Sequence, residues 1–311
     1  MVERLNFNEF VTAVANRISA ELESIYDVTI TNTTKNNGLS LQGVCIRCGN
    51  CNIAPVIYLM DYHIDYVKGK DFEEVVSDIL KTYRNSNKTM PPIKTFEWDI
   101  TKDSIILKLV NYKMNQQMLQ EIPYKIVFGD LAVTFHVLVS STKEGVQTVK
   151  IVNKLFDGFG VSIDEMYEIA LENTMRLFPA SIRDMNEMIV STLEAEMGDM
   201  KDWQELKELT LPTVEEPRMF VLSNSAGING AATLLYSEVL KEFADKAGRD
   251  IFILPSSIHE IILVLMISKE FKVEDLRSMV KEVNQNNVPI EDVLSNSVYR
   301  YSRKENSIER L

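Results

Sequence analysis

The chain has 311 residues and is acidic, because 45 Asp and Glu outnumber 33 Lys and Arg and leave a formal charge of -12. A field of this sign repels phosphate backbones and anionic lipid surfaces, which disfavours nucleic acid as a partner. The longest apolar run, Ile261 to Ile267, is far shorter than the roughly 18–20 residues of a membrane-spanning helix. We therefore expect a globular protein without a membrane span.

The beginning of the sequence lacks the basic region and the apolar stretch of a secretion signal. Three cysteines, an odd number in a chain of this length, do not make a disulfide framework and agree with a reducing compartment. These two features predict a cytoplasmic protein. Neither indicates an oligomeric state, which the sequence leaves open.

Residues 1–90 are predicted to form an N-terminal lobe of helix, hairpin, strand and helix. Apolar residues spaced three and four apart between positions 7 and 22 give the first helix one buried stripe. The hairpin turns at Asn37-Gly38, a dipeptide that tolerates the positive φ angles of a tight turn. A polar stretch with two prolines, residues 85–92, ends this lobe.

Residues 91–215 are predicted to form an antiparallel meander followed by two helices. Ser162 caps the first of these helices, and the second begins near Ser181. His136 shares a strand face with Thr134 and Leu138, so we interpret it as a half-buried structural histidine. The four strands of the meander are predicted at residues 105–110, 124–128, 131–139 and 146–152.

Residues 216–302 are predicted to form a C-terminal lobe of strand, loop, helix and two strands, with a last helix near Met279. The helix at residues 231–247 ends at Gly248, where a left-handed residue is favoured. Residues 303–311 are charged and apolar-poor, so we expect them to fray. The whole pattern predicts an α+β fold, mostly antiparallel sheet with helices packed on it, in two lobes.

Cys45, Cys48 and Cys51 are spaced so that their thiolates could share one metal ion, with His63 as a fourth ligand. The motif is incomplete, because structural zinc usually draws its ligands from two separated pairs. If the strand continues to Cys51, Cys48 points to the face opposite the other two cysteines. Metal binding and incidental thiols are both open interpretations.

The stretch Ser223 to Gly230 connects a strand to a helix, an arrangement in which backbone N–H groups can hold an anion. Asn224, Gly227, Asn229 and Gly230 are its candidate ligand-binding residues. The stretch lacks the third glycine of a dinucleotide fingerprint and the lysine of a phosphate loop. Its glycines and asparagines are also typical of a simple turn and helix cap.

The turn from Pro255 to Glu260 lies between two predicted strands and carries several reactive side chains. Ser257, His259 and Glu260 are the candidate catalytic residues, and Ser256 is a further candidate for ligand binding. No nucleophile elbow and no second histidine of a zinc-binding helix accompanies them. A hydrogen-bonded structural turn is the alternative interpretation.

Three stretches resemble a known family: residues 35–38 with 52–59, residues 219–230 with the following helix, and residues 253–260. Together they resemble an uncharacterised bacterial family known only as a domain of unknown function, number 5688. The likeness extends from the first helix to about Met266 and does not include the cysteines. The resemblance implies bacterial origin and a link to mobile elements, and it implies no activity. It draws attention to Asn37, Gly38, Pro55, Tyr58, Pro255, Ser256, Ser257, His259 and Glu260.

The leading hypothesis is a non-enzymatic binding or adaptor protein that needs no cofactor and holds a protein or small molecule at these two loops. It rests on a negative observation, since no nucleophile is paired with a base and no metal shell is complete. The competing hypothesis is a hydrolase or transferase, with His259 as base, Glu260 as its orienting group and the glycine loop holding an anion. Metal binding through the cysteines is the third.

Overall fold

The computed structural model describes residues 4–49, 54–89, 96–142, 145–197, 217–255, 257–265 and 272–311. The chain divides into two compact units. Unit 1 comprises Met1–Glu97 and Val139–Thr148, and unit 2 comprises Trp98–Leu138 and Val149–Leu311.

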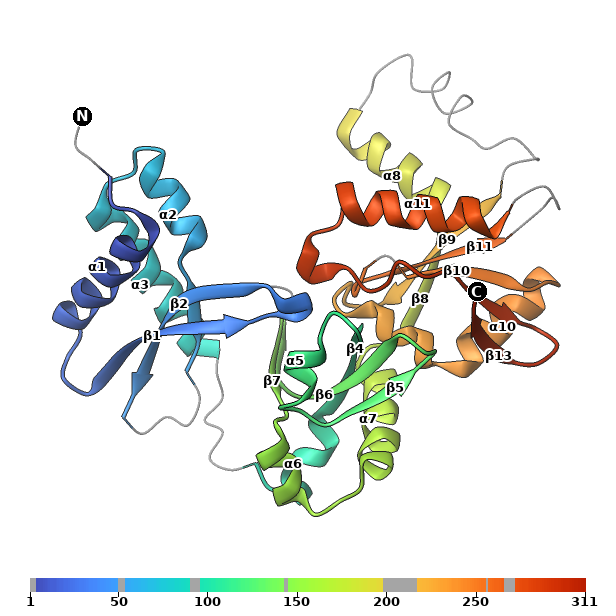
Figure 1. Ribbon diagram of the computed structural model, residues 1–311, viewed down its shortest axis with the longest axis horizontal. Helices are drawn as coiled ribbons and strands as arrows, with labels where there is room; N and C mark the ends of the chain where they lie inside the picture. The colour runs from blue at the N-terminus through green and yellow to red at the C-terminus, as the bar shows by residue number, and fades with distance from the viewer. Residues whose placement is uncertain are drawn as a thin grey trace. The chain divides into compact units, whose positions relative to one another are not determined.

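Unit 1 contains a three-stranded antiparallel sheet in the order β1-β2-β3, on which helices pack (Figure 1). The α1 helix begins with a capping box, in which the backbone N–H of Glu9 donates to Asn6 and the Asn6 N–H donates to Glu9. Asn37 has φ of 59° at the hairpin turn, as expected for this dipeptide. The elements are α1 (Phe7–Glu21), β1 (Tyr26–Thr34), η1 (Asn36–Gly38), β2 (Ser40–Cys48), β3 (Val56–Tyr58), α2 (Met60–Val67) and α3 (Phe72–Thr89).

The core of unit 1 is formed by the apolar stripe of α1, the inner face of the sheet and the apolar stripe of α3. Phe10, Val14 and Ile18 are fully buried at the spacing of four that the sequence predicts for one helix face. Val75 and Ile79 of α3 are buried in the same cluster. A fully buried aliphatic side chain contributes roughly 1.5–3 kcal/mol, so this stripe determines how α1 packs.

Unit 2 contains a six-stranded sheet and most of a four-stranded sheet, both mostly antiparallel. The end of β6 and most of β7 in the four-stranded sheet belong to unit 1. The helices and strands up to the six-stranded sheet are α4 (Trp98–Thr101), η2 (Lys102–Ser104), β4 (Ile105–Asn111), α5 (Gln116–Leu119), β5 (Tyr124–Val127), β6 (Leu131–Thr142), β7 (Gly145–Lys150), α6 (Asn153–Phe159) and α7 (Ile163–Leu177). The elements that follow are β8 (Ala180–Asp184), α8 (Met185–Met197), β9 (Arg218–Asn224), η3 (Gly230–Leu235), α10 (Ser237–Ala247), β10 (Ile251–Leu254), β11 (Ile261–Leu265), α11 (Val273–Asn286), η4 (Ile290–Asp292), β12 (Tyr299–Ser302) and β13 (Ser307–Arg310).

The four-stranded sheet is built around β6, which pairs with β4, β5 and β7. A simple meander would pair β4 with β5, but β6 lies between them in the order β4-β6-β5. The connection from β4 to β5 contains α5, which gives the chain the length to cross to the far edge of β6. Residues of this connection also form one wall of a groove in unit 2.

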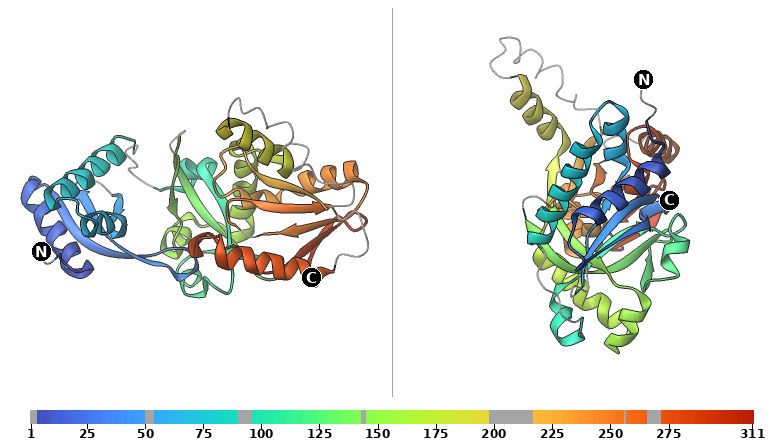
Figure 2. Two further views of the ribbon diagram at one scale, coloured as in Figure 1. Left: turned by 90° about the horizontal axis from the view of Figure 1, so that it is seen from above. Right: turned by 90° about the vertical axis from the view of Figure 1, so that its left-hand side faces the viewer.

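The six-stranded sheet has the order β13-β12-β10-β11-β9-β8 and carries helices on both faces. Neighbouring residues of β9 point to opposite faces: Phe220 contacts Phe243 of α10, whereas Met219 packs with Leu276 of α11. Figures 1 and 2 show α10 and α11 on opposite sides of this sheet. The α+β prediction, mostly antiparallel sheet with packed helices, is confirmed.

Three local predictions were wrong. The second helix of the middle region begins at Met185 and not near Ser181, because residues 180–184 form β8 and pair with β9. The helix predicted at 231–247 is divided into η3 and α10 by Tyr236, whose ψ of 86° is not helical. The tail expected to fray contains β13, which pairs with β12. Each of these outcomes depends on a strand partner or a backbone break that local periodicity does not encode.

Among the described residues, no helix combines the length and the apolar character needed to cross a bilayer.

Candidate functional site

The loops after β9 and β10 meet at one edge of the six-stranded sheet. Because β11 lies between β9 and β10 and pairs antiparallel with both, these two strands run in the same direction and end at the same edge. The hydroxyl of Ser223 donates to the carbonyl oxygen of His259 at 2.8 Å, and the N–H of Ala231 donates to the carbonyl of Ile258 at 3.1 Å. The predicted candidates on the two loops are therefore neighbours.

The first of these loops uses most of its polar groups to hold its own shape. Asn224 is buried, its Nδ2 donates to the carbonyl of Ile228 at 2.9 Å, and its Oδ1 accepts from the N–H of Ala226 at 3.0 Å. The N–H of Gly227 donates to the Asn224 carbonyl at 3.1 Å, and Gly227 and Asn229 both have positive φ. The amides that would face an anion are largely occupied. The helix that follows, η3, has six residues, so it offers little helix dipole to an anion.

Gly230 allows the two loops to approach closely. A Cβ atom at this position would lie 2.1 Å from Ser223 Oγ, 2.4 Å from the carbonyl oxygen of His259 and 2.8 Å from the backbone nitrogen of Asn224. Real Cβ atoms do not reach such distances to backbone atoms, so glycine is needed for packing here. Gly230 therefore has a structural role that its position in a glycine-containing loop did not reveal.

Both ring nitrogens of His259 have partners within the protein. Nδ1 accepts from the backbone N–H of Asn229 at 3.2 Å, so the ring proton is on Nε2, which lies 3.2 Å from Oδ1 of Asp292. The backbone N–H of His259 also donates to Ser257 Oγ at 3.0 Å. A general base needs a lone pair free for the proton it removes, and in this arrangement His259 has none.

The carboxylate that contacts His259 is Asp292, whereas the neighbouring Glu260 is exposed. Asp292 is on η4, 33 residues further along the chain. The backbone of the turn is attached to the same segment, since Ile258 N–H donates to the Asp292 carbonyl and Ser295 N–H donates to the Pro255 carbonyl. Residue 256, the serine predicted as a ligand contact, lies outside the described residues. Ligand binding and acid–base chemistry at these loops remain predictions.

A buried carboxylate, Asp130, adjoins this segment, and the sequence analysis did not identify it. The hydroxyls of Ser295 and Ser297 each donate to its Oδ2 at 2.8 Å, and the hydroxyl of Tyr299 donates to its Oδ1. Arg310 Nη1 lies 3.9 Å from the same carboxylate. Burial, and to a smaller extent the hydrogen bond to Asp130, raises the pKa of Tyr299 far above its ordinary value. This Asp130 cluster connects the residue that precedes β6 to Tyr299 of β12.

The cysteine motif is described only in part. Cys45 and Cys48 are both in β2, and because they are three residues apart their side chains point to opposite faces of the strand. Burial raises the pKa of the Cys45 thiol and so disfavours the thiolate that binds metal. Cys51 lies outside the described residues. No group of three metal-binding side chains occurs in the described part of the chain.

His63 and His136 both have structural contacts. The His63 ring packs against Phe7 and Phe10 with centroids 5.3 and 5.0 Å apart, and its Nε2 lies 3.0 Å from the carbonyl oxygen of Leu5. His136 is buried in β6 with Nε2 3.1 Å from Thr134 Oγ1. Burial is the main cause that lowers the pKa of His136 well below its ordinary value, and two nearby lysines lower this pKa further. The imidazole therefore stays neutral.

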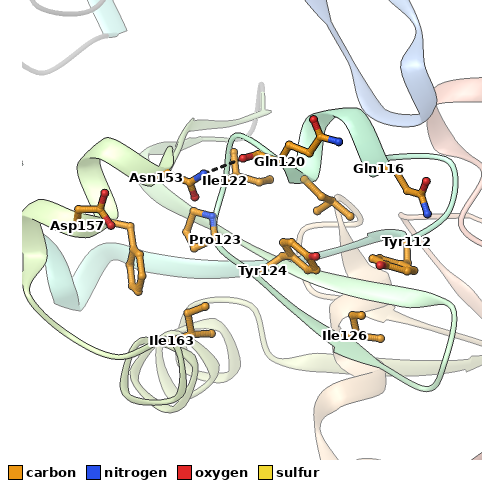
Figure 3. Close-up of a pocket in the computed structure, with 12 residues that line it drawn as sticks. Tyr112, Gln116, Gln120, Ile122, Pro123, Tyr124, Ile126, Asn153, Asp157 and Ile163 are labelled. Carbon is orange, nitrogen blue, oxygen red and sulfur yellow. Dashed lines mark hydrogen bonds between the residues drawn. The ribbon is translucent and has the colours of Figure 1, made fainter.

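An open groove with a cavity volume of about 870 Å³ lies in unit 2 beside β5 and α6 (Figure 3). The rings of Tyr112 and Tyr124 have centroids 6.1 Å apart and are tilted by 34°. The Nδ2 of Asn153 donates to the backbone carbonyl of Gln120 at 2.9 Å across the groove. The described residues that line it are mostly apolar or aromatic: Tyr112, Gln116, Leu119, Gln120, Ile122, Pro123, Tyr124, Ile126, Asn153, Phe156, Asp157 and Ile163.

One weak sequence signal for this groove is a proline and two tyrosines in and around the connection between two strands, where functional residues often lie. Its walls come from α5, β5 and α6, and helical periodicity cannot predict a helix of four residues such as α5. A second, smaller cavity of about 540 Å³ lies beside β8 and α10. Its walls contain the ion pair between Arg218 and Asp184, 2.6 Å apart, so part of its polar lining is already neutralised.

Together, the fold and the sites define an α+β protein with antiparallel sheets, a tightly hydrogen-bonded junction of loops and an open groove lined by aromatic rings. The chain belongs to DUF5688, a family of unknown function whose model matches residues 7–303. The resemblance found in the sequence is thereby confirmed. No curated protein and no solved structure matches the chain.

Proposed function

We propose that this protein binds a ligand without transforming it, and that the groove of unit 2 is the binding site. The observation that carries the proposal is the shape and lining of the groove. Its volume of about 870 Å³ is within the roughly 300–1,000 Å³ of small-molecule sites, which are typically apolar and aromatic with a few polar groups. The three amides and one carboxylate of this lining are polar groups of that kind.

The chemistry of the lining supports binding over catalysis. No histidine, cysteine, serine or lysine is among the twelve described residues that line the groove, and Asp157 is the one carboxylate among them. The described lining therefore lacks a nucleophile paired with a histidine or lysine base. The strongest catalytic candidate, His259, lies elsewhere, and both of its ring nitrogens are engaged by Asn229 and Asp292. Acid–base catalysis there would first require one of these hydrogen bonds to break.

The proposal is tested by saturation-transfer NMR with a mixed library of amines, carboxylates, sugars, nucleosides and neutral aromatics. We expect a subset to bind wild-type protein, and we expect Tyr124→Ala to remove that signal because it deletes an aromatic wall. The matched control is Tyr58→Ala, which removes a tyrosine of β3 in unit 1. A library that gives no signal, or a signal that Tyr124→Ala leaves unchanged, contradicts the proposal.

A parallel assay addresses the enzymatic alternative. Wild-type protein and His259→Asn are compared on chromogenic carboxyl and phosphate esters. We expect no hydrolysis above the buffer rate from either protein. Hydrolysis by wild type that His259→Asn abolishes would overturn the non-enzymatic assignment.

A further inference from the structure

We infer that the ligand of the groove is a small organic cation, an alkyl- or arylammonium ion. This inference rests on the proposed function and adds the chemical class of the ligand. It is carried by three features of the groove: its aromatic faces, the sign of its charge and the chemistry of its polar atoms.

The aromatic faces come from Tyr112 and Tyr124, which are both half-buried. Their rings are offset and tilted by 34° with centroids 6.1 Å apart, and in Figure 3 they lie in a row with Pro123. The face of a tyrosine ring carries negative electrostatic potential and attracts a cation within about 6 Å of its centroid. Both rings line the groove and also pack against a small core cluster. Two neighbouring aromatic rings are suited to the methyl or methylene groups around an ammonium nitrogen.

The charge of the groove is negative. Asp157 on α6 is exposed and is the one charged residue among the described residues of the lining. An anionic ligand would meet this carboxylate without a lysine, arginine or histidine of the lining to balance it, and the chain carries a net charge of -12. The Asp157 carboxylate and the negative net charge of the chain both attract a cationic ligand.

The polar side chains of the lining include oxygen atoms with partial or full negative charge, which attract a cation. Because Nδ2 of Asn153 already donates to the carbonyl of Gln120, the Asn153 Oδ1 is the atom that this side chain offers as an acceptor. The Asp157 carboxylate accepts without donating. The side-chain amides of Gln116 and Gln120 supply further acceptor oxygens.

The nearest cation on β5 does not compete for the groove. Lys125 follows Tyr124 in an extended strand, so its side chain points to the opposite face. There its Nζ lies 2.9 Å from Asp164 Oδ1 and 4.4 Å from the ring centroid of Tyr167. The chain thus holds one ammonium group between a carboxylate and a tyrosine face, the same two kinds of group that line the groove.

The test is a calorimetric titration of the full chain with choline and benzyltrimethylammonium. Each is compared with a neutral isostere in which a tert-butyl group replaces the trimethylammonium group. We expect the cations to bind about two- to thirtyfold more tightly than their isosteres, which is the range of a cation–π contact. Tyr124→Ala and Asp157→Asn should each weaken cation binding, and added salt should weaken it further. Asp99→Asn removes a highly exposed carboxylate outside the groove and should leave binding unchanged.

The outcomes separate this inference from the proposed function. Equal affinity for cation and isostere, with both lost in Tyr124→Ala, would overturn the ligand class and leave groove binding intact. Failure of these probes and of the whole library would overturn both. Cation binding that responds to Asp99→Asn as strongly as to Asp157→Asn would indicate general attraction to an acidic chain and would overturn the assignment to the groove.

Discussion

The His259 junction, where residues 223–230 meet residues 255–260, and the groove beside β5 both contain polar side chains. They differ in where these polar groups find partners. At the junction, the side chains of Asn224 and His259 hydrogen-bond to other protein atoms. In the groove, the carboxylate of Asp157 is exposed and two half-buried tyrosine rings form part of the wall. The difference teaches that a conspicuous sequence motif can serve stability, whereas the side chains available to a ligand are inconspicuous in the sequence. Substitutions should therefore affect stability at the first region and binding at the second.

The largest effect is expected from Gly230→Ala at the junction. The new methyl group would meet backbone atoms of His259 and Asn224 at 2.4 and 2.8 Å, so we expect a loss of at least about 3 kcal/mol in the free energy of unfolding. Gly227→Ala is the control, because it has φ of +66° but no atom within 4 Å of its Cβ and should cost about 1 kcal/mol. Urea unfolding measures both. Equal losses would contradict the close approach of the two loops.

Asp130→Ala should have the next largest effect. It leaves the hydroxyls of Ser295, Ser297 and Tyr299 without their shared acceptor, and losing hydrogen bonds to a buried charge costs about 2–3 kcal/mol. Asp99→Ala, at an exposed position, is the control and should change stability by less than about 0.5 kcal/mol. If the two variants unfold at the same urea concentration, the Asp130 cluster does not stabilise the fold.

His259→Ala tests the junction itself. It removes the acceptor of Asn229 and the donor to Asp292, and we expect a loss of about 1–2 kcal/mol. A double-mutant cycle with Asp292→Ala should give a coupling energy of roughly 1 kcal/mol. Additive losses from the two single variants would show that the contact between these side chains does not contribute to stability.

His136 provides a pH test of a histidine that is buried and neutral. Its pKa in the folded state is lowered by burial, so the unfolded chain takes up this proton first as the pH falls. The contribution of neutral His136 to the free energy of unfolding is complete above the pKa of the unfolded chain, about 6.5. Below that pH the free energy of unfolding falls by up to about 1.4 kcal/mol per pH unit until the pKa of the folded state is reached. Thermal unfolding of wild type and His136→Gln between these limits measures the difference. Parallel pH profiles would contradict a neutral buried His136.

The smallest effect on stability is expected at the groove. Asp157 is exposed, so Asp157→Asn should change the free energy of unfolding by less than about 0.5 kcal/mol. The same variant is expected to weaken cation binding. A marked loss of stability would remove the contrast between the two regions.

Local sequence patterns predicted the parts of the fold that depend on near neighbours. The capping box of α1, the turn at Asn37 and the stripe through Phe10 and Ile18 depend on residues within a few positions of one another. The meeting of the two loops was also predictable, because the directions of β9 and β10 bring their ends to one edge. The cap, the turn and the stripe required no knowledge of distant partners, whereas the meeting of the loops depends on β11 lying between β9 and β10.

Other features depend on residues that are far apart in the chain. Glu260 was predicted as the partner of His259 because it is adjacent in sequence, but the fold brings Asp292 to the ring across 33 residues. The Asp130 cluster joins residues up to 169 positions apart. The groove depends on a short helix and on exposed residues, for which hydrophobic periodicity gives no signal.

The separation of Asp130 from Tyr299 also has a consequence for biosynthesis. At about 5–20 residues per second, the ribosome takes roughly 10–30 seconds to cover the 169 positions that separate them. During that interval the nascent chain carries a hydrated carboxylate where the finished protein has three hydroxyl donors. The contact between Asp130 and β12 is therefore a late event of synthesis, formed after the rest of unit 2 up to β12 has been made.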